Sequence, residues 1–358
     1  MDPTSLIPGA DSIPAPAWLF LVLDIALFAI HILLVNVIIG GSLITVVSRF
    51  RAGNDTLNQR LHGSIAGKLP TAFALAVNMG VAPLLFLQVI YGNLFYASSV
   101  LLAVYWILVI PLLILAYYGA YIHIRKYSSS LLSKISISIS AIILLYIAFV
   151  FVNNMTLMIQ PEKWNAYFDN RGGTILNWGD MTLVPRYLHF IAASVAVSGL
   201  LMAFIWSYRQ KKGVAGAETK VKSSLLIFGY ATIGQVVVGL WFLLAIPRDF
   251  MLNFMGGDIF STIIFMLGFL AAIGAIATAF ANKFRPTLSM LIVTILAMII
   301  MRHQLRTMYL NGKFSLSSLE LAPQYGVMIL FFGVLIAGLL AVWYMIKTAF
   351  VKQEGRAA

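Results

Sequence analysis

The stretch PRYLHFIAASVAVSGLLMAFIW, from Pro185 to Trp206, decides the class of this protein. Beyond Arg186 and His189 it is almost wholly apolar, and it has the roughly 20 residues that an α-helix needs to cross a bilayer. An imidazole in such a span faces lipid, another protein group or an iron, and burying it without a partner costs on the order of a few kcal/mol. We therefore interpret His189 as a candidate ligand of a buried haem.

The composition indicates that the whole chain, and not this stretch alone, belongs to a membrane protein. The 358 residues are 61% hydrophobic and 10% charged, with a mean hydropathy of +0.94. Soluble domains carry roughly 25% charged residues, so the sequence predicts an all-α fold, a polytopic membrane helical bundle. We find no internal repeat, low-complexity segment or linker, and we treat residues 1–358 as a single integral membrane domain.

The chain contains no cysteine. This excludes disulfides, thiolate metal sites, iron–sulfur clusters and haem attached covalently through a CxxCH motif. Histidine, methionine and the carboxylates remain as possible metal ligands.

Apolar runs of spanning length predict about nine transmembrane helices. They lie near residues 17–47, 70–96, 98–123, 135–159, 183–208, 223–246, 259–281, 287–309 and 325–348. The longest outer connection, 161–185, is rich in aromatic residues, and we expect it to lie at the interface or to cover a buried group.

The basic residues predict the orientation. Of the 24 Lys and Arg residues, 17 fall on one side, in connections 49–68, 125–134, 209–222 and 283–285 and in the C-terminal tail. The positive-inside rule then places the N-terminus outside and the C-terminus in the cytoplasm, in a multi-pass protein of the inner (cytoplasmic) membrane. The net charge of +12 reflects this topology, and we expect no nucleic-acid partner because the cations are dispersed without stacking aromatics.

Two further histidines lie within predicted spans. His31 sits mid-span with no charge within a turn, and Asp24, two helical turns earlier, projects from the same helix face. We expect His31 to be a haem ligand rather than a core imidazole bonded to a neighbouring hydroxyl or carbonyl. His303, in the eighth predicted helix, is a further candidate haem ligand. Its neighbours Arg302 and Arg306 suit either haem propionates or an interfacial anchor.

The remaining histidines, His62 and His123, lie at predicted cytoplasmic ends close to Lys and Arg residues. We expect both imidazoles to be solvated.

Four stretches resemble subunit I of the cytochrome bd quinol oxidases. They are HILLVNVIIG at 31–40, GVAPLLFLQVIYG at 80–92, VNNMTLMIQP at 152–161, and RYLHFIAASVAVSG at 186–199. The likeness covers roughly the first seven predicted helices. It implies that His31 holds the high-spin b haem and His189 the low-spin b haem, with Met266 in the seventh helix as the sixth ligand of the low-spin haem.

Two departures from the family pattern weaken an assignment to oxygen reduction. The long outer loop where the oxidases are thought to bind quinol is replaced by residues 247–258, and the third helix, 101–121, carries no carboxylate. Proton delivery into a dry site needs titratable groups, and Asp24 is the one carboxylate that we expect within the membrane. Asp24 either accepts a quinol proton near the outer face or snorkels to the interface as a polar residue.

The leading hypothesis is a bd-like b-type cytochrome, a subunit of a quinol-oxidising complex that exchanges electrons between the quinone pool and a partner redox protein. It would hold two or more b haems. The residues placed near the propionates are Arg186, Arg248, Arg302 and Arg306. Gln88 and Asn154, with Asn78, Asn153 and Gln160, either order a quinone headgroup or form interhelical hydrogen bonds. The expected partners are the lipid bilayer, quinone, and a second membrane subunit or a c-type cytochrome.

Two alternatives remain. A complete bd-type oxidase would reduce oxygen at a haem on His31. A cofactor-free transporter would use the polar residues to line a substrate path, with Pro83 and Pro111 breaking helices, although the corresponding repeat halves are absent from the sequence.

Overall fold

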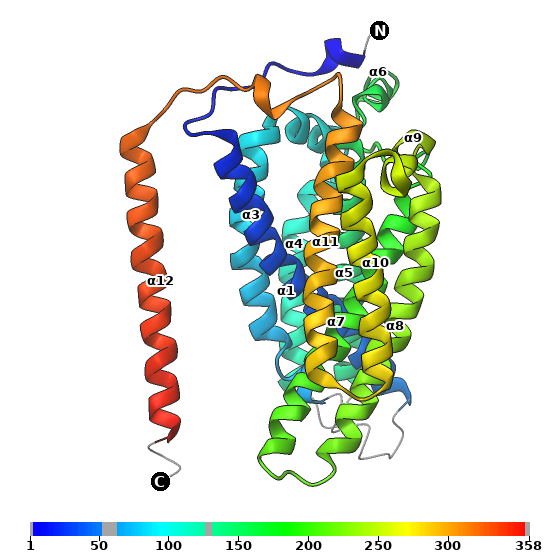
Figure 1. Ribbon diagram of the computed structural model, residues 1–358, viewed down its shortest axis with the longest axis vertical. Helices are drawn as coiled ribbons and strands as arrows, with labels where there is room; N and C mark the ends of the chain where they lie inside the picture. The colour runs from blue at the N-terminus through cyan, green and yellow to red at the C-terminus, as the bar shows by residue number, and fades with distance from the viewer. Residues whose placement is uncertain (1–2, 52–62, 126–130, 355–358) are drawn as a thin grey trace.

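A computed structural model describes residues 3–51, 63–125 and 131–354. In these ranges nine helices are long and apolar enough to cross a membrane, which confirms the predicted helical membrane bundle. They are α1 (Ala17–Arg51), α3 (Leu69–Leu101), α4 (Ala103–Arg125), α5 (Leu131–Met158), α7 (Leu183–Lys211), α8 (Ala217–Ala245), α10 (Ile259–Phe280), α11 (Phe284–Leu310) and α12 (Tyr325–Glu354). Eight of them pack side by side, and α12 stands apart (Figure 1).

Several helices extend beyond their predicted ends. The helix α8 begins at Ala217, six residues before the apolar run, and α7 continues through Arg209 to Lys211. Together they project past the other helices at the end of the bundle opposite α6 (Ala166–Asp169) (Figure 1). Hydropathy identifies only the apolar part of a helix, whereas the backbone hydrogen bonds of the helix continue through polar residues beyond that part.

Small residues hold α1 against α7. A Cβ at Gly40 would overlap the backbone carbonyl of Ser194, so the two backbones touch at this point. The Ser194 hydroxyl donates to the Asn36 side-chain oxygen at 2.9 Å, and the Ser198 hydroxyl donates to the Asn36 carbonyl at 3.1 Å. Close backbone contact with interhelical hydrogen bonds is how helices associate where lipid removes the hydrophobic driving force.

The segment that precedes α12 is hydrogen-bonded to the segment that precedes α1. The Ile13 N–H donates to Glu320 O at 2.8 Å, and the Ala322 N–H donates to Ile13 O at 2.9 Å. None of the most apolar 18 residues of α12 is buried inside the protein. These residues therefore face the membrane or another chain.

The aromatic connection after α5 is folded against the bundle, in short turns at Pro161–Lys163 and Ala166–Asp169. Trp164 is buried and its indole N–H donates to Leu157 O at 2.9 Å, whereas Trp178 is exposed and its ring contacts Phe149. This connection therefore packs on the core through Trp164 and leaves the aromatic side chain of Trp178 exposed at the surface of the protein.

The connection before α10 forms a short helix, α9 (Arg248–Leu252), followed by a π-helical turn (Asn253–Gly257). Asp258 then caps α10, accepting from the Ser261 N–H at 2.7 Å. The hydrogen bonds from Ser261 hold the pKa of Asp258 below its ordinary value.

One histidine is not solvated as predicted. His123 is fully buried, with Nδ1 3.0 Å from Ser133 O and 2.9 Å from Ser133 Oγ. The prediction failed because sequence position near basic residues does not reveal that the start of α5 folds over this imidazole. His62 lies outside the described residues.

The close contact between α1 and α7 predicts that a substitution at Gly40 destabilises the protein, and Gly234 in α8 serves as a control outside this contact. Gly40→Ala places a methyl group where the Ser194 carbonyl lies, and overpacking of this kind costs about 1–3 kcal/mol. We expect the thermal unfolding midpoint in detergent to fall by several degrees. Gly234→Ala, within α8, meets no atom within 4 Å and should leave the midpoint unchanged or raise it. Equal midpoints for the two variants would contradict this packing.

Candidate functional site

His31 and His189, on different helices, share one hydrogen-bond arrangement. His31 Nδ1 lies 3.0 Å from Ala76 O of α3, and His189 Nδ1 lies 3.1 Å from Gln235 O of α8. A carbonyl oxygen only accepts, so the neutral imidazole carries its proton on Nδ1 in both cases. The lone pair of each ring is then on Nε2, and that of His189 accepts from the side-chain amide of Gln235 at 3.2 Å.

A glycine follows each accepting carbonyl by four residues, at Gly80 and Gly239. A Cβ at Gly80 would lie 2.5 Å from His31 Cε1, and one at Gly239 would lie 3.1 Å from His189 Cε1. In an α-helix the carbonyl of residue i faces the N–H of residue i+4, so each glycine stands beside the carbonyl that holds the imidazole. The absence of a side chain lets the ring edge reach the backbone of the neighbouring helix.

This arrangement fits a metal-ligating histidine. Ligating imidazoles almost always donate their other N–H to a carbonyl or a carboxylate, which fixes the tautomer and the ring plane. Both rings also lie in apolar spans, where a neutral imidazole is favoured over a charged one. Among the described residues no group of three or more His, Asp and Glu side chains could hold a bare metal ion. A group that brings its own equatorial nitrogens to the metal, as haem does, needs only one or two ligands from the protein.

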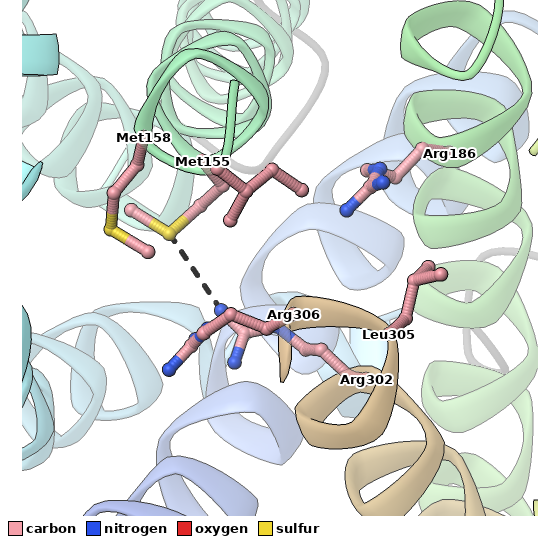
Figure 2. Close-up of a pocket in the computed structure, with 7 residues that line it drawn as sticks. Met155, Met158, Arg186, Arg302, Leu305 and Arg306 are labelled. Carbon is pink, nitrogen blue, oxygen red and sulfur yellow. Dashed lines mark hydrogen bonds between the residues drawn. The ribbon is translucent and has the colours of Figure 1, made fainter. Parts of the chain in front are cut away.

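Three arginines converge near the end of the bundle where α7 begins. Arg186 of α7 and Arg302 and Arg306 of α11 line a small cavity together with Met155 and other apolar side chains (Figure 2). Arg302 Nη2 lies 3.7 Å from Met155 Sδ, the contact drawn as a dashed line. The cavity measures about 20 Å³, whereas pockets for whole organic ligands measure roughly 300–1,000 Å³. It is therefore too small for a complete cofactor, and its volume is about that needed by a single water molecule.

Each guanidinium of this arginine cluster stacks on an aromatic ring. The distances from guanidinium carbon to ring centroid are 4.9 Å for Arg186 on Phe242, 4.4 Å for Arg302 on Phe28 and 4.7 Å for Arg306 on Tyr91. Stacking holds the planar groups in place while leaving N–H edges for a ligand.

The cluster carries more positive than negative charge. Arg306 Nη1 lies 4.0 Å from Asp24 Oδ2, with both side chains buried. Asp180 lies within electrostatic range of Arg186, but this carboxylate is already bound by Gln160 and Thr182. Three guanidiniums thus face two carboxylates.

Two buried nitrogens near the arginine cluster have no hydrogen-bond partner among the described residues, Arg186 Nε and His303 Nδ1. Polar atoms buried in this way are normally satisfied. An added anion would satisfy the excess charge and Arg186 Nε together.

Other candidate residues lie elsewhere. Arg248 is exposed on α9, outside the arginine cluster, and Met266 is 41% exposed on α10. The amide of Asn154 accepts from Ser98 Oγ and donates to Ser99 Oγ, which joins α5 to α3. Gln88 is half-buried on α3.

Sequence reasoning missed Ala76, Gly80, Gln235 and Gly239, which position the two imidazoles. In each helix the residue with the accepting carbonyl is followed four positions later by a glycine, and this spacing is visible in the sequence. The spacing alone does not identify the two sites, because α3 and α8 contain other glycines as well. Only the helix packing identifies which carbonyls the imidazoles reach.

Comparison with solved structures gives an informative likeness. No protein-family model matches the chain, and no curated protein matches its sequence. Among solved structures, the bd oxidase from Geobacillus thermodenitrificans has a chain that is similar with a TM-score of 0.67 at 12% sequence identity; the match covers 92% of this chain and 97% of that chain. This protein therefore has a bd-oxidase-like fold, as the four resembling stretches predicted.

The charge balance of the arginine cluster can be tested with Asp24→Asn. Removing this carboxylate leaves buried Arg306 without its partner, and breaking a buried pair costs up to about 3–5 kcal/mol. We expect a clear fall in the thermal unfolding midpoint in detergent. The matched change Asp169→Asn, at an exposed position in α6, should have no such effect. A midpoint unchanged by Asp24→Asn would show that the pair is not needed to balance the cluster.

Proposed function

We propose that this protein is a membrane-embedded b-type cytochrome subunit that exchanges electrons between the quinone pool and a partner redox protein. The observation that carries the proposal is the shared setting of His31 and His189, in which Nδ1 is bonded to a backbone carbonyl and the lone pair is left on Nε2. The bd-oxidase-like fold supports it, since the similar solved structure is that of an oxidase.

In this proposal His31 and His189 each bind one b haem through Nε2. The haem supplies the one-electron redox couple when bound, and its axial ligands and burial set the potential. Ala76 and Gln235 orient the two imidazoles through their carbonyls, and Gly80 and Gly239 provide the room. The apolar spans around both rings exclude water from the ligands.

Arg186, Arg302 and Arg306 are proposed to bind haem propionates. Guanidinium and carboxylate pair in a bidentate geometry, and all three arginines line the cavity while each lies over an aromatic ring. His303 lies between Arg302 and Arg306 with a buried Nδ1 that has no described partner, which suits a contact to the same haem. Arg248 was expected at the propionates and Met266 as an iron ligand, and the exposed side chains of both make these roles less suitable.

The remaining parts of the proposal concern quinone and partners. We propose Asp24 as the acceptor of a quinol proton and Gln88 as a residue that orders the headgroup. The burial of Asp24 beside Arg306 supports this role over that of a side chain reaching the interface. Asn154 is bonded to Ser98 and Ser99, which favours an interhelical role. We propose that the exposed apolar helices face lipid and a second membrane subunit, with the basic connections in the cytoplasm.

A complete oxidase that reduces oxygen at the His31 haem is the second candidate, and the fold comparison favours it. A measurement of oxygen consumption distinguishes the two candidate functions. Quinol-dependent oxygen consumption by the purified complex indicates the oxidase, and its absence in a haem-loaded complex indicates the electron-transfer subunit.

The haem assignment predicts the spectra of three histidine variants. We expect the purified protein to show a b-type α-band in its reduced-minus-oxidised spectrum. His31→Ala and His189→Ala should each lower the haem-to-protein ratio, because each removes an iron ligand. His123→Ala also removes a buried imidazole, but one bonded to Ser133 rather than placed as a ligand, and it should keep the full haem content.

Size-exclusion profiles and expression levels of the three variants provide the control for folding. Normal haem content in a well-folded His189→Ala protein would contradict the assignment of that ligand. A wild-type protein prepared from its native membrane without any haem spectrum would contradict the proposed function as a whole.

A further inference from the structure

One exposed face of α7 changes from apolar to cationic along the last two turns of the helix. Phe204 is 54% exposed, and its ring centroid lies 6.1 Å from that of Phe284, the first residue of α11. Tyr208 is 51% exposed, and the Nζ of Lys212, which caps α7, lies 4.8 Å from its ring centroid. Positions 204, 208 and 212 are four residues apart and share one face of the helix. We call Phe204, Tyr208 and Lys212 the α7 strip.

The side chain of Lys212 lies back along α7, over the ring of the residue one turn before it. Side chains on a helix lean toward its N-terminus, which at this position is the direction of the bundle. The ammonium group is thereby held at the level of Tyr208. A phenyl ring, a phenol hydroxyl and an ammonium group therefore follow one another outward along the α7 strip.

Positive charge dominates the end of the bundle where the α7 strip terminates. Connection 209–222, between α7 and α8, carries five Lys and Arg residues against one acidic residue. Lys283 and Arg285 flank Phe284 at the start of α11. Because Phe284 contacts Phe204, the cations of both segments surround the same patch. An occupant with a net negative charge is favoured over a neutral one.

The cations differ in whether they already have a partner. Arg209 and Lys220 lie over the buried ring of Trp206, at 4.4 and 3.9 Å from the ring centroid. Lys212 and Arg285 are exposed, and within the described part of the chain neither forms an ion pair. These two side chains are accessible to an anionic ligand.

We propose that the α7 strip, together with Arg285, binds an anionic phospholipid. The groups along the strip match the order of groups in such a lipid from the hydrocarbon core outward. The acyl chain lies against Phe204, the glycerol esters lie beside the Tyr208 hydroxyl, and the phosphate lies beside Lys212, with Arg285 adding positive charge nearby. Aromatic residues are typical of this depth, and basic residues next to a membrane helix attract anionic headgroups.

In the orientation proposed above, this end of the bundle lies at the cytoplasmic leaflet, where anionic lipids provide such headgroups. The binding of lipid here does not depend on the haem assignment. A protein without haem would refute the proposed function and leave this site in place.

Native mass spectrometry of the full chain tests the proposal. The protein, purified in detergent, is titrated with phosphatidylglycerol or with phosphatidylcholine of the same acyl chains, and the first binding step is compared. We expect phosphatidylglycerol to bind more tightly to the wild type. Lys212→Gln should weaken this binding about fivefold, the effect of one basic residue at an anionic surface, and Lys212→Arg should retain it.

Lys222→Gln is the matched control, because Lys222 is also exposed and belongs to the same connection but lies outside the α7 strip. It should weaken the binding of phosphatidylglycerol less than Lys212→Gln does. Arg285→Gln, on a different helix, should weaken binding in the same direction as Lys212→Gln and provides a second variant if that protein is unstable. Equal thermal unfolding midpoints in lipid-free detergent show that the variants are folded.

Three outcomes would overturn the proposal. Equal affinity of the wild type for the two lipids would show that the headgroup charge is not recognised. Equal losses in Lys212→Gln and Lys222→Gln would indicate a general attraction by the net charge of this end of the bundle. Displacement of the lipid by inorganic phosphate at the same concentration would show a site for the ion alone, without a contribution from Phe204 and Tyr208.

Discussion

The hydrogen bond from an imidazole Nδ1 to a helix carbonyl, made inside the membrane, is the interaction on which the site depends. A carbonyl in a helix is already bonded within that helix, and a ring as bulky as imidazole reaches it most easily where a neighbouring side chain is missing. Gly80 and Gly239 meet that condition for His31 and His189. The result is two neutral rings with defined orientation and a lone pair on Nε2, which is the arrangement that a metal ligand needs.

The arginine cluster adds a second constraint at one end of the same bundle. Burying guanidiniums is costly unless they are paired. The carboxylates near Arg186, Arg302 and Arg306 are Asp24 and Asp180, and the other described partners of these arginines are aromatic rings, Met155 and Thr182. The excess positive charge and the buried Arg186 Nε are both explained by an anionic group at the cavity. In the proposed function, haem propionates would supply that charge.

Much of the fold could be predicted because hydropathy is a local property of the sequence. The nine spans follow from apolar runs. The stretch around His189 indicates a membrane helix and shows that this helix carries a histidine among apolar residues. The ends of α7 and α8 could not be placed in this way, since these helices continue with basic residues beyond the apolar run.

The site could be predicted only in part, because it depends on which helices are neighbours. Arg186 and Arg302, far apart in sequence, were expected at propionates and do meet at one cavity, whereas Arg248 is exposed on α9. The burial of His123 under Ser133 and the contacts of Gln235 with His189 and Met298 are tertiary. No periodicity along one helix reveals which carbonyl of the next helix faces an imidazole.

The most direct test of the account is a cryo-electron microscopy density map of the protein purified from its native membrane. The account predicts flat, porphyrin-sized density joined to Nε2 of both His31 and His189, with Nδ1 of each ring still at the carbonyls of Ala76 and Gln235. A well-resolved map with only side chains and lipid around both imidazoles would contradict it.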